Sequence, residues 1–389
     1  MSSKKEEKMD VIKIVNDIFH EAVEMGASDI HFEPRKDSMT VRFRVDGILK
    51  MAFEGDLTLF EFVVARMKVL AQLDSTGLPR SQEGNIKFTY SQEHIVDMRV
   101  SIMPTSYGEC IVVRILERKD AMGNLRELGF TSLQIESIEK ILKKSYGLIL
   151  VTGPNGAGKS TTLFNMLQKL NSPEKSLVTL EDPVERKIDM VRQTNINPKT
   201  GLSFANGLKF LLRQDPDVIM VGEIRDMETA KTTVQAAITG HLVLATIHTS
   251  TAAGAIVRLI NMGVEPFLLS SAIKFISAQR LARINCPKCK EEYFPSKDLL
   301  EMLDAPKDVR FYHSIGCDDC NQKGLYGREA VHEVLIIDKE IQNLILTKPS
   351  EDQINDIAVK NGMKTLRHIA MERVYDGTIS IEEAIRLAA

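Results

Sequence analysis

The sequence predicts an α/β protein whose larger domain is a mainly parallel β-sheet with crossover helices. Short apolar runs that suit buried strands alternate with segments in which apolar residues recur at helical spacing. These runs are 148–151, 177–180, 218–221 and 242–247. The first of them leads into Gly153–Ser160, which fits the phosphate-loop pattern G-x-x-x-x-G-K-[ST] and is followed by a helical pattern. Strand, loop and helix therefore occur in the order that a phosphate-binding site requires.

Length and composition limit the possible classes of protein. A chain of 389 residues is long enough for two or three domains. Its formal net charge of −3 disfavours broad phosphate neutralisation, so we expect no direct binding of nucleic acid. No apolar run approaches the roughly twenty residues that span a bilayer, and the N-terminus lacks the apolar core of a signal peptide. The sequence therefore predicts a cytoplasmic protein whose partners are proteins and whose five cysteines are reduced.

Residues 1–118 are expected to form a small N-terminal α+β domain. A helical pattern opens this domain and stops near Gly26. In 41–45, apolar residues alternate with arginines before Asp46-Gly47, which indicates a half-buried strand followed by a tight hairpin turn.

Two arginines of this domain lie in strand-like segments. Arg99 is expected on the polar face of the alternating run 96–102. Arg114 shares its parity with Cys110 and Leu116, so it lies at a strand end or is directed at something beyond its own domain. Cys110 is expected to be a buried thiol.

An interdomain linker is predicted at 119–125, because that stretch is polar and contains glycine. The domain that follows, 126–389, carries two additions to its sheet and crossover helices. A cysteine-rich insertion is expected at 284–325, and a C-terminal helical segment at 338–389.

The phosphate-loop pattern predicts nucleotide binding. Its glycines let backbone N–H groups converge on phosphate oxygens at the positive end of the following helix. Lys159 can reach the outer phosphates, and Ser160 can ligate magnesium. The residues expected to bind nucleotide here are Gly153, Pro154, Asn155, Gly156, Ala157, Gly158, Lys159, Ser160 and Thr161.

Acidic residues follow two of the predicted strands. Glu223 follows the third apolar run, where a carboxylate can hold magnesium or its waters; the alternative is a surface carboxylate. Glu181, Asp182 and Glu185 directly follow the second run. Such crowding raises the pKa of each acid unless cations compensate, so one of them could orient an attacking water. The alternative is a solvated acidic turn.

Histidines bracket the last apolar run. His241 precedes it, and His248 follows it together with hydroxyl residues. A histidine in such a place is either catalytic or a structural hydrogen-bonding residue. His248 is a candidate site residue because its strand comes after the one that precedes Glu223; the histidine signal by itself is weak.

Four cysteines form two C-x-x-C pairs, Cys286/Cys289 and Cys317/Cys320, with 27 residues between the pairs. Four thiolates suit a tetrahedral zinc ion and leave no coordination position open, so we expect a structural zinc site. The competing interpretation is a redox motif, but such motifs usually occur singly.

In order and in detail, these motifs resemble those of the type II secretion and type IV pilus assembly (extension) ATPases, the GspE/PilB type. The matching segments are 152–163 (Walker A), 181–185 (aspartate box), 222–226 (atypical Walker B) and 241–248 (histidine box). Segments 28–34 and 42–47 resemble the N-terminal domain of this family. The resemblance implies a RecA-like motor domain and a PAS-like fold for the N-terminal domain.

The resemblance also implies roles for single residues. Glu185 matches the glutamate that activates the attacking water, with Glu181 as the alternative base, and Glu223 helps to organise magnesium and the γ-phosphate. Arg213 resembles an arginine near the phosphates, and His248 belongs to the histidine box.

Arg99 and Arg114 match two arginines that move from the N-terminal domain onto the nucleotide when the two domains close. The four-cysteine element favours extension or secretion, because the retraction ATPases of this family lack it. Most members carry a further domain before the region that resembles this chain, so we expect a truncated or naturally short member.

The implied function is that of a homo-hexameric ATP hydrolase that uses ATP, Mg²⁺ and Zn²⁺ and drives assembly of a type IV pilus or a type II secretion pseudopilus. Its expected partners are an inner-membrane platform protein and other pilus or secretion components, which place it at the cytoplasmic face of the inner membrane. Alternatives in the same superfamily are a retraction motor and a competence or DNA-uptake motor.

The sequence disfavours two other classes of enzyme. A nucleic-acid translocase is disfavoured by the dispersed arginines and the absence of tryptophan, since a channel for single strands uses aromatic stacking. A nucleotide kinase with a zinc-stabilised lid is disfavoured because the cysteines lie more than a hundred residues after Lys159.

Overall fold

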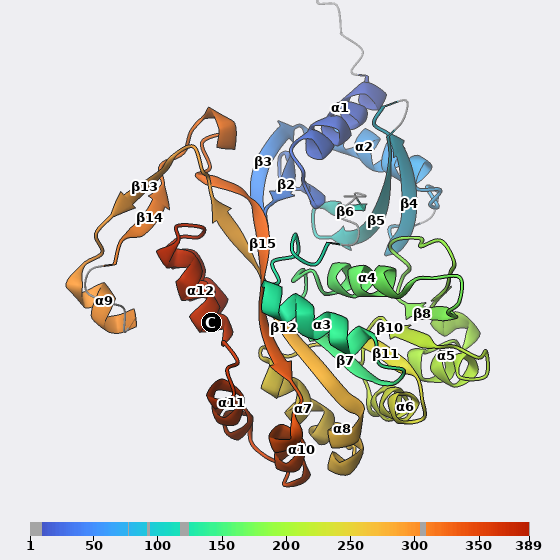
Figure 1. Ribbon diagram of the computed structural model, residues 1–389. Coiled ribbons are helices and arrows are strands. Elements are labelled where there is room, and N and C mark those ends of the chain that lie inside the picture. The colour runs from blue at the N-terminus through green and yellow to red at the C-terminus, as the bar shows by residue number, and fades with distance from the viewer. Residues whose placement is uncertain (1–9, 77, 92–93, 117–123, 304–308, 389) are drawn as a thin grey trace, which may run out of the picture. The chain divides into compact units, whose positions relative to one another are not determined.

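The computed structural model describes residues 10–76, 78–91, 94–116, 124–303 and 309–388, and the chain divides into two compact units (Figure 1). We call Met1–Asp120 the N-terminal unit and Ala121–Ala389 the C-terminal unit. The linker predicted at 119–125 lies largely outside the described residues. Within the described part of the chain, no helix has the length and apolar character needed to cross a membrane.

The N-terminal unit contains a six-stranded antiparallel sheet in the order β3-β2-β1-β6-β5-β4, with helices α1 and α2. Its elements are α1 (Val11–Glu24), β1 (Asp29–Pro34), β2 (Met39–Val45), β3 (Ile48–Gly55), α2 (Leu57–Leu70), β4 (Gln82–Thr89), β5 (Ile95–Thr105) and β6 (Gly108–Leu116). Asp10 begins α1 by accepting hydrogen bonds from the N–H groups of Ile12 and Lys13. The apolar faces of the two helices and the sheet form one core.

Strand β2 confirms the predicted half-buried alternation, because its apolar residues at 41, 43 and 45 are buried and the two arginines between them are partly exposed. Asp46-Gly47 forms the predicted two-residue turn, with φ values of 50° and 83°. On β5, Arg99 lies on the face opposite to the buried Met98 and Val100, as expected.

The structure settles which face of β6 is buried, a point that the sequence left open. Its buried side chains are Ile111, Val113 and Ile115, so Cys110 and Arg114 lie on the other face of the sheet. The sequence could not decide this, because β6 lies inside the sheet and carries apolar residues at both parities. Arg114 therefore occupies an ordinary exposed position on its strand.

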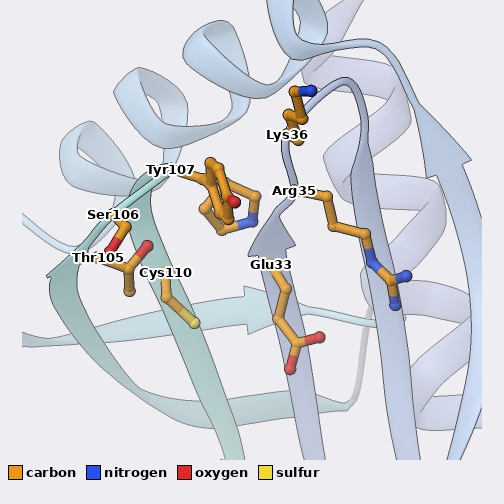
Figure 2. Close-up of a pocket in the computed structure, with 8 residues that line it drawn as sticks. Glu33, Arg35, Lys36, Thr105, Ser106, Tyr107 and Cys110 are labelled. Carbon is orange, nitrogen blue, oxygen red and sulfur yellow. The ribbon is translucent and has the colours of Figure 1, made fainter.

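Cys110 is half-buried rather than buried in the core, which corrects the expectation for this thiol. It lines a pocket of about 540 Å³ together with Glu33, Arg35 and Tyr107 (Figure 2). Burial raises the pKa of the Cys110 thiol, which favours its protonated and less reactive form.

The C-terminal unit contains a seven-stranded sheet in the order β15-β12-β7-β11-β10-β8-β9. Its strands are β7 (Gly147–Thr152), β8 (Leu177–Glu181), β9 (Val191–Asn195), β10 (Val218–Val221), β11 (Leu242–Ile247), β12 (Ile273–Asn285) and β15 (Leu325–Ile336). Every neighbouring pair is parallel except β12 with β15. The four predicted strands lie within β7, β8, β10 and β11, which confirms the mainly parallel sheet.

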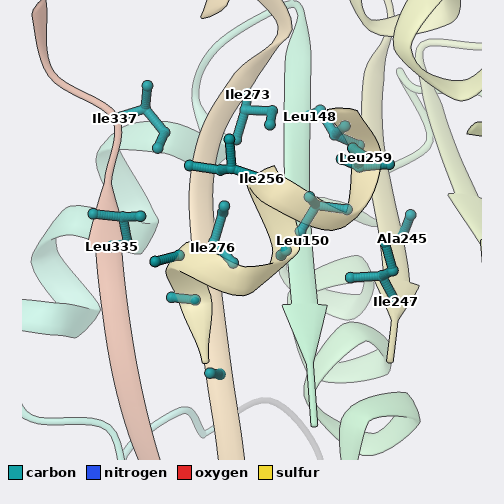
Figure 3. Packing of buried hydrophobic residues seen from close by; sticks show 14 of the residues in the cluster. Leu148, Leu150, Ala245, Ile247, Ile256, Leu259, Ile273, Ile276, Leu335 and Ile337 are labelled. Atoms are coloured by element: carbon teal, nitrogen blue, oxygen red, sulfur yellow. The ribbon is translucent and has the colours of Figure 1, made fainter. Parts of the chain in front are cut away.

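Helices cover both faces of this sheet, as crossover connections require. They are α3 (Ser132–Leu142), α4 (Lys159–Leu170), α5 (Phe204–Leu211), α6 (Met227–Ile238), α7 (Ala252–Asn261) and α8 (Pro266–Ala272). Leu148 and Leu150 of β7 join a large apolar core with α7 and α8 (Figure 3). Ile149 and Val151 join a second core with α3 and α4. Residues 148–151 of β7 are all apolar because both faces of the strand are buried.

The cysteine-rich insertion lies between β12 and β15. It contains β13 (Lys290–Tyr293), α9 (Lys297–Leu303) and β14 (Phe311–Ser314), and β13 pairs antiparallel with β14. The C-terminal helices follow β15; they are α10 (Lys339–Leu346), α11 (Glu351–Lys360), α12 (Leu366–Tyr375) and α13 (Ile381–Ala388). The buried Glu333 carboxylate on β15 accepts hydrogen bonds from the N–H groups of Ala252 and Leu366, so it ties α12 to α7.

Candidate nucleotide-binding site

The candidate site residues of the C-terminal unit follow four neighbouring parallel strands. The phosphate loop 153–158 follows β7, His248 follows β11, Glu223 follows β10, and Glu181 ends β8. Ligands of open α/β sheets bind at the carboxyl ends of the strands, and these four ends share one edge of the sheet. Segments that are far apart in the sequence thereby form one candidate site.

The phosphate loop turns sharply between β7 and α4. Gly153 and Gly158 have φ values of 148° and 84°, in the region that favours glycine. A Cβ on Gly153 would lie 2.4 Å from the carbonyl oxygen of Gln279, so only glycine fits there. Gly158 is the N-cap of α4, and Lys159 begins the helix. Backbone N–H groups at a helix N-terminus are the arrangement that binds phosphate.

The Lys159 side chain folds back over the loop. Its Nζ donates to the carbonyl oxygens of Gly153 and Pro154, both at 2.9 Å. Burial lowers the pKa of Lys159, and the negative charge of Glu223 opposes this shift. The ammonium group is partly desolvated next to the loop, where a phosphate could replace the two carbonyl oxygens as its partner. Ser160 is exposed in the first turn of α4, as is Thr161.

Glu223 lies between two basic side chains. Arg225 forms an ion pair with Glu223 Oε1, and its other nitrogen lies 3.7 Å from the Asp182 carboxylate. His248 Nε2 lies 3.4 Å from Glu223 Oε2. The structure thus brings Glu223 and His248 together and adds Arg225, which sequence reasoning did not select. Its available signal was its position two residues after Glu223, just beyond a strand end.

The acids after β8 differ in environment. Glu181 is buried, and its Oε1 accepts hydrogen bonds from Thr179 Oγ1 at 2.6 Å and from Gln193 Nε2 at 2.9 Å. Burial raises the pKa of Glu181. Glu185 is exposed, so its carboxylate is the more accessible of the two candidate bases. Arg213 is also exposed, two residues after the end of α5.

Arg99 and Arg114 of the N-terminal unit are direct cross-strand neighbours on β5 and β6. Arg99 donates to Glu83 at 2.6 Å, and Arg114 Nε donates to Asp29 at 3.0 Å. The side chains of the two arginines are 42% and 66% exposed. The sheet therefore presents two adjacent guanidinium groups on one accessible face.

The two C-x-x-C pairs come together as a four-sulfur cluster. All four sulfur atoms lie within 4.8 Å of one another. The sulfurs of Cys286 and Cys317 are 3.8 Å apart, those of Cys289 and Cys320 are 3.9 Å apart, and those of Cys317 and Cys320 are 3.7 Å apart. A tetrahedron with Zn–S bonds of about 2.3 Å has edges of about 3.8 Å, so the cluster has the dimensions of a closed zinc site.

Comparison with known proteins gives a family match over nearly the whole chain. The model of the family described as "Type II/IV secretion system protein" matches residues 4–386. The type II secretion system ATPase E of Vibrio cholerae is 43% identical over 384 residues, which are 98% of this chain and 76% of that protein. The type IV pilus assembly ATPase PilB of Thermus thermophilus is 41% identical over 377 residues, which are 96% of this chain and 42% of that protein.

Solved structures show the same fold. The pilus retraction motor PilT, solved with bound ADP, superposes with a TM-score of 0.64 at 26% identity and covers 96% of each chain. The ATPase DotB of Legionella pneumophila superposes with a TM-score of 0.72 at 19% identity, covering 100% of this chain and 98% of that one.

Proposed function

We propose that this chain, which belongs to the type II/IV secretion system protein family, uses ATP hydrolysis to drive assembly of a type IV pilus or a type II secretion pseudopilus. It is an ATP hydrolase of the secretion and pilus-assembly type, with the RecA-like α/β fold of such ATPases. The observation that carries the proposal is the convergence of the phosphate loop, Glu223 and His248 at one edge of the sheet.

The loop N–H groups and Lys159 would hold the phosphates of ATP, and the Ser160 hydroxyl with the Glu223 carboxylate would hold Mg²⁺ or its waters. Oxygen ligands of this kind are the ones that Mg²⁺ prefers, so the residues present fit the ion. Bound Mg²⁺ neutralises charge on the phosphate oxygens. Glu185 orients the attacking water, which its exposure supports, whereas Glu181 is buried and hydrogen-bonded.

Arg99 and Arg114 complete the site from the N-terminal unit when nucleotide is bound. Their guanidinium groups are adjacent and exposed, and each would exchange its carboxylate partner, Glu83 or Asp29, for an oxygen of the γ-phosphate. ATP then favours the closed arrangement by its additional contacts with the arginines, and product release lets the units separate. Arg213 is a further arginine of the phosphate site, and His248 acts through its contact with Glu223.

The working form is a homo-hexamer bound to an inner-membrane platform protein and other components of the machinery, at the cytoplasmic face of the membrane. The names of its relatives, a type II secretion ATPase and a pilus assembly ATPase, support a role in such machinery, and the resemblance to the family implies the hexamer and the platform protein. The four-cysteine cluster favours fibre extension or secretion over retraction.

Deletion of the gene in its native host tests the assignment. We expect loss of surface fibres or of a secreted protein, restored by the wild-type chain but not by a Lys159→Ala chain. If fibres and secretion both persist in the deletion strain, the proposed role in assembly is wrong even though the chain is an ATP hydrolase.

We also propose that the cysteine cluster binds one structural zinc ion. Metal analysis of the purified protein should find about one zinc per chain. A Cys286→Ser, Cys320→Ser double variant should lose the metal and become sensitive to proteolysis within 284–325, because the two halves of the cluster are then no longer joined. Cys110→Ser is the matched control, since Cys110 lies in the other unit. A stable, metal-free wild-type protein would refute the site.

A further inference from the structure

Strand β12 continues past the end of β7 and runs alongside the phosphate loop. Ala278 pairs with Thr152, the last residue of β7, so the next residue of β12, Gln279, lies level with Gly153. Gln279 is only 1% exposed, although its side chain is an uncharged amide. A buried amide at this place must find partners for both its oxygen and its nitrogen.

Both partners of the Gln279 amide belong to the phosphate-loop segment. Gln279 Nε2 donates to the carbonyl oxygen of Ala157, and Gln279 Oε1 accepts a hydrogen bond from Thr162 Oγ1 at 2.9 Å. The backbone carbonyl oxygen of Gln279 occupies the space that a Cβ on Gly153 would need. One residue of β12 thus contacts the start of the loop, the end of the loop and the first turn of α4.

We propose that Gln279 is a positioning residue that sets the direction of a phosphate-binding N–H group. In a trans peptide the C=O and the following N–H point to opposite sides. When Gln279 holds the Ala157 carbonyl towards β12, the N–H of Gly158 points the other way, into the space that the loop encloses. The hydrogen bond from Thr162 fixes the amide so that its NH₂ group faces Ala157. This inference needs only nucleotide binding at the loop, not a role in fibre assembly.

A buried histidine lies beside Gln279 on the neighbouring strand. His332 on β15 lies directly opposite Gln279 and is stacked on Phe130, with ring centroids 3.6 Å apart. Its Nε2 lies 2.6 Å from the Leu128 carbonyl oxygen, and its Nδ1 lies 3.2 Å from Ser277 Oγ. Burial lowers the pKa of His332 to about 4, so the ring is neutral near pH 7. The side chains next to Gln279 on this side are therefore closely packed, and the histidine among them is uncharged.

Steady-state kinetics with ATP and Mg²⁺ on the full chain test this role. Gln279→Leu keeps a similar volume but removes both hydrogen bonds, and we expect kcat/KM to fall about 10- to 100-fold, as a misplaced binding group can cause. Ser277→Ala is the matched control, because Ser277 is equally buried on the same face of β12 and contacts His332 instead of the loop. It should keep kcat/KM within about twofold of the wild-type value.

A second variant, Gln279→Glu, distinguishes a positioning role of Gln279 from a role in stability. It also keeps the proposal testable if Gln279→Leu fails to fold. In Gln279→Glu the side chain keeps its size, and its carboxylate can accept from Thr162 but cannot donate to Ala157 until it is protonated. Its kcat/KM, relative to wild type, should therefore recover as the pH is lowered. The rise in melting temperature caused by ATP should also shrink in both Gln279 variants but not in Ser277→Ala.

Equal losses in the Gln279 and Ser277 variants, or a Gln279→Glu deficit that does not change with pH, would overturn the proposal. Lys159→Ala, measured in parallel, separates this outcome from failure of the site itself. If Lys159→Ala still turns over ATP, the nucleotide site is wrongly placed; if it is inactive while Gln279→Leu is normal, only the role of Gln279 is wrong.

Discussion

Lys159→Ala should lose ATP turnover by at least about 10²- to 10³-fold while the protein stays folded. The ammonium group of Lys159 donates hydrogen bonds to the carbonyl oxygens of Gly153 and Pro154. It can therefore exchange these partners for the oxygens of a phosphate that enters the loop. Lys169→Ala is the control on the same helix. Lys169 lies at the far end of α4 and forms an ion pair with Glu139 of α3. Replacing Lys169 by alanine should leave ATP turnover close to the wild-type level.

Glu223→Ala should cause a comparable loss for a different reason. The Glu223 carboxylate is 15% exposed and sits between Arg225 and His248, so its removal takes away both the proposed magnesium partner and the shared partner of these two side chains. Glu228→Ala is the control, because Glu228 is an exposed acidic residue in the first turn of α6. Turnover near the wild-type level in Lys159→Ala or Glu223→Ala, measured as phosphate release, would show that the site is elsewhere.

The Arg99→Ala, Arg114→Ala double variant should bind ATP but hydrolyse it about 10³- to 10⁵-fold more slowly, the range reported for arginine fingers. Arg99 forms an exposed ion pair with Glu83, which contributes about 0–1 kcal/mol to stability. Arg114 pairs with the buried Asp29, which keeps a hydrogen bond from Ser28 Oγ and has Arg44 Nε at 3.8 Å, so the N-terminal unit should stay folded. Rapid-quench kinetics with saturating ATP isolate the hydrolysis step.

Arg80→Ala controls for the loss of a positive charge from the N-terminal unit, since Arg80 forms an exposed ion pair with Asp74. It should hydrolyse ATP at nearly the wild-type rate. If the Arg99, Arg114 double variant does the same, the two arginines have no part in the mechanism.

Much of the C-terminal unit could be predicted from the sequence because its signals are local. The strand before the loop is apolar at 148–151, and the loop itself needs glycine at fixed places. The residues after β10 and β11 can be found once the parallel order is assumed. The spacing of the cysteines was sufficient to predict their cluster, because two C-x-x-C pairs bring four sulfurs within reach of one ion.

The residues that sequence reasoning missed depend on contacts between distant segments. Gln279 lies on a strand whose burial shows no simple alternation, because β12 is covered on both faces and carries polar residues inside. Its partners, Ala157 and Thr162, are more than a hundred residues away in the chain. The face of β6 that bears Arg114 was likewise undetermined, because either parity of that strand could have formed the core.

The central claim is that one nucleotide lies between the loop and carboxylates of the C-terminal unit and the two arginines of the N-terminal unit. A crystal structure with Mg²⁺ and a non-hydrolysable ATP analogue tests it most directly. We predict phosphates on the loop 153–158 and, in at least one subunit, the Arg99 and Arg114 guanidinium groups within hydrogen-bond distance of the terminal phosphate. Nucleotide bound in every subunit with both arginines still on Glu83 and Asp29 would contradict the account.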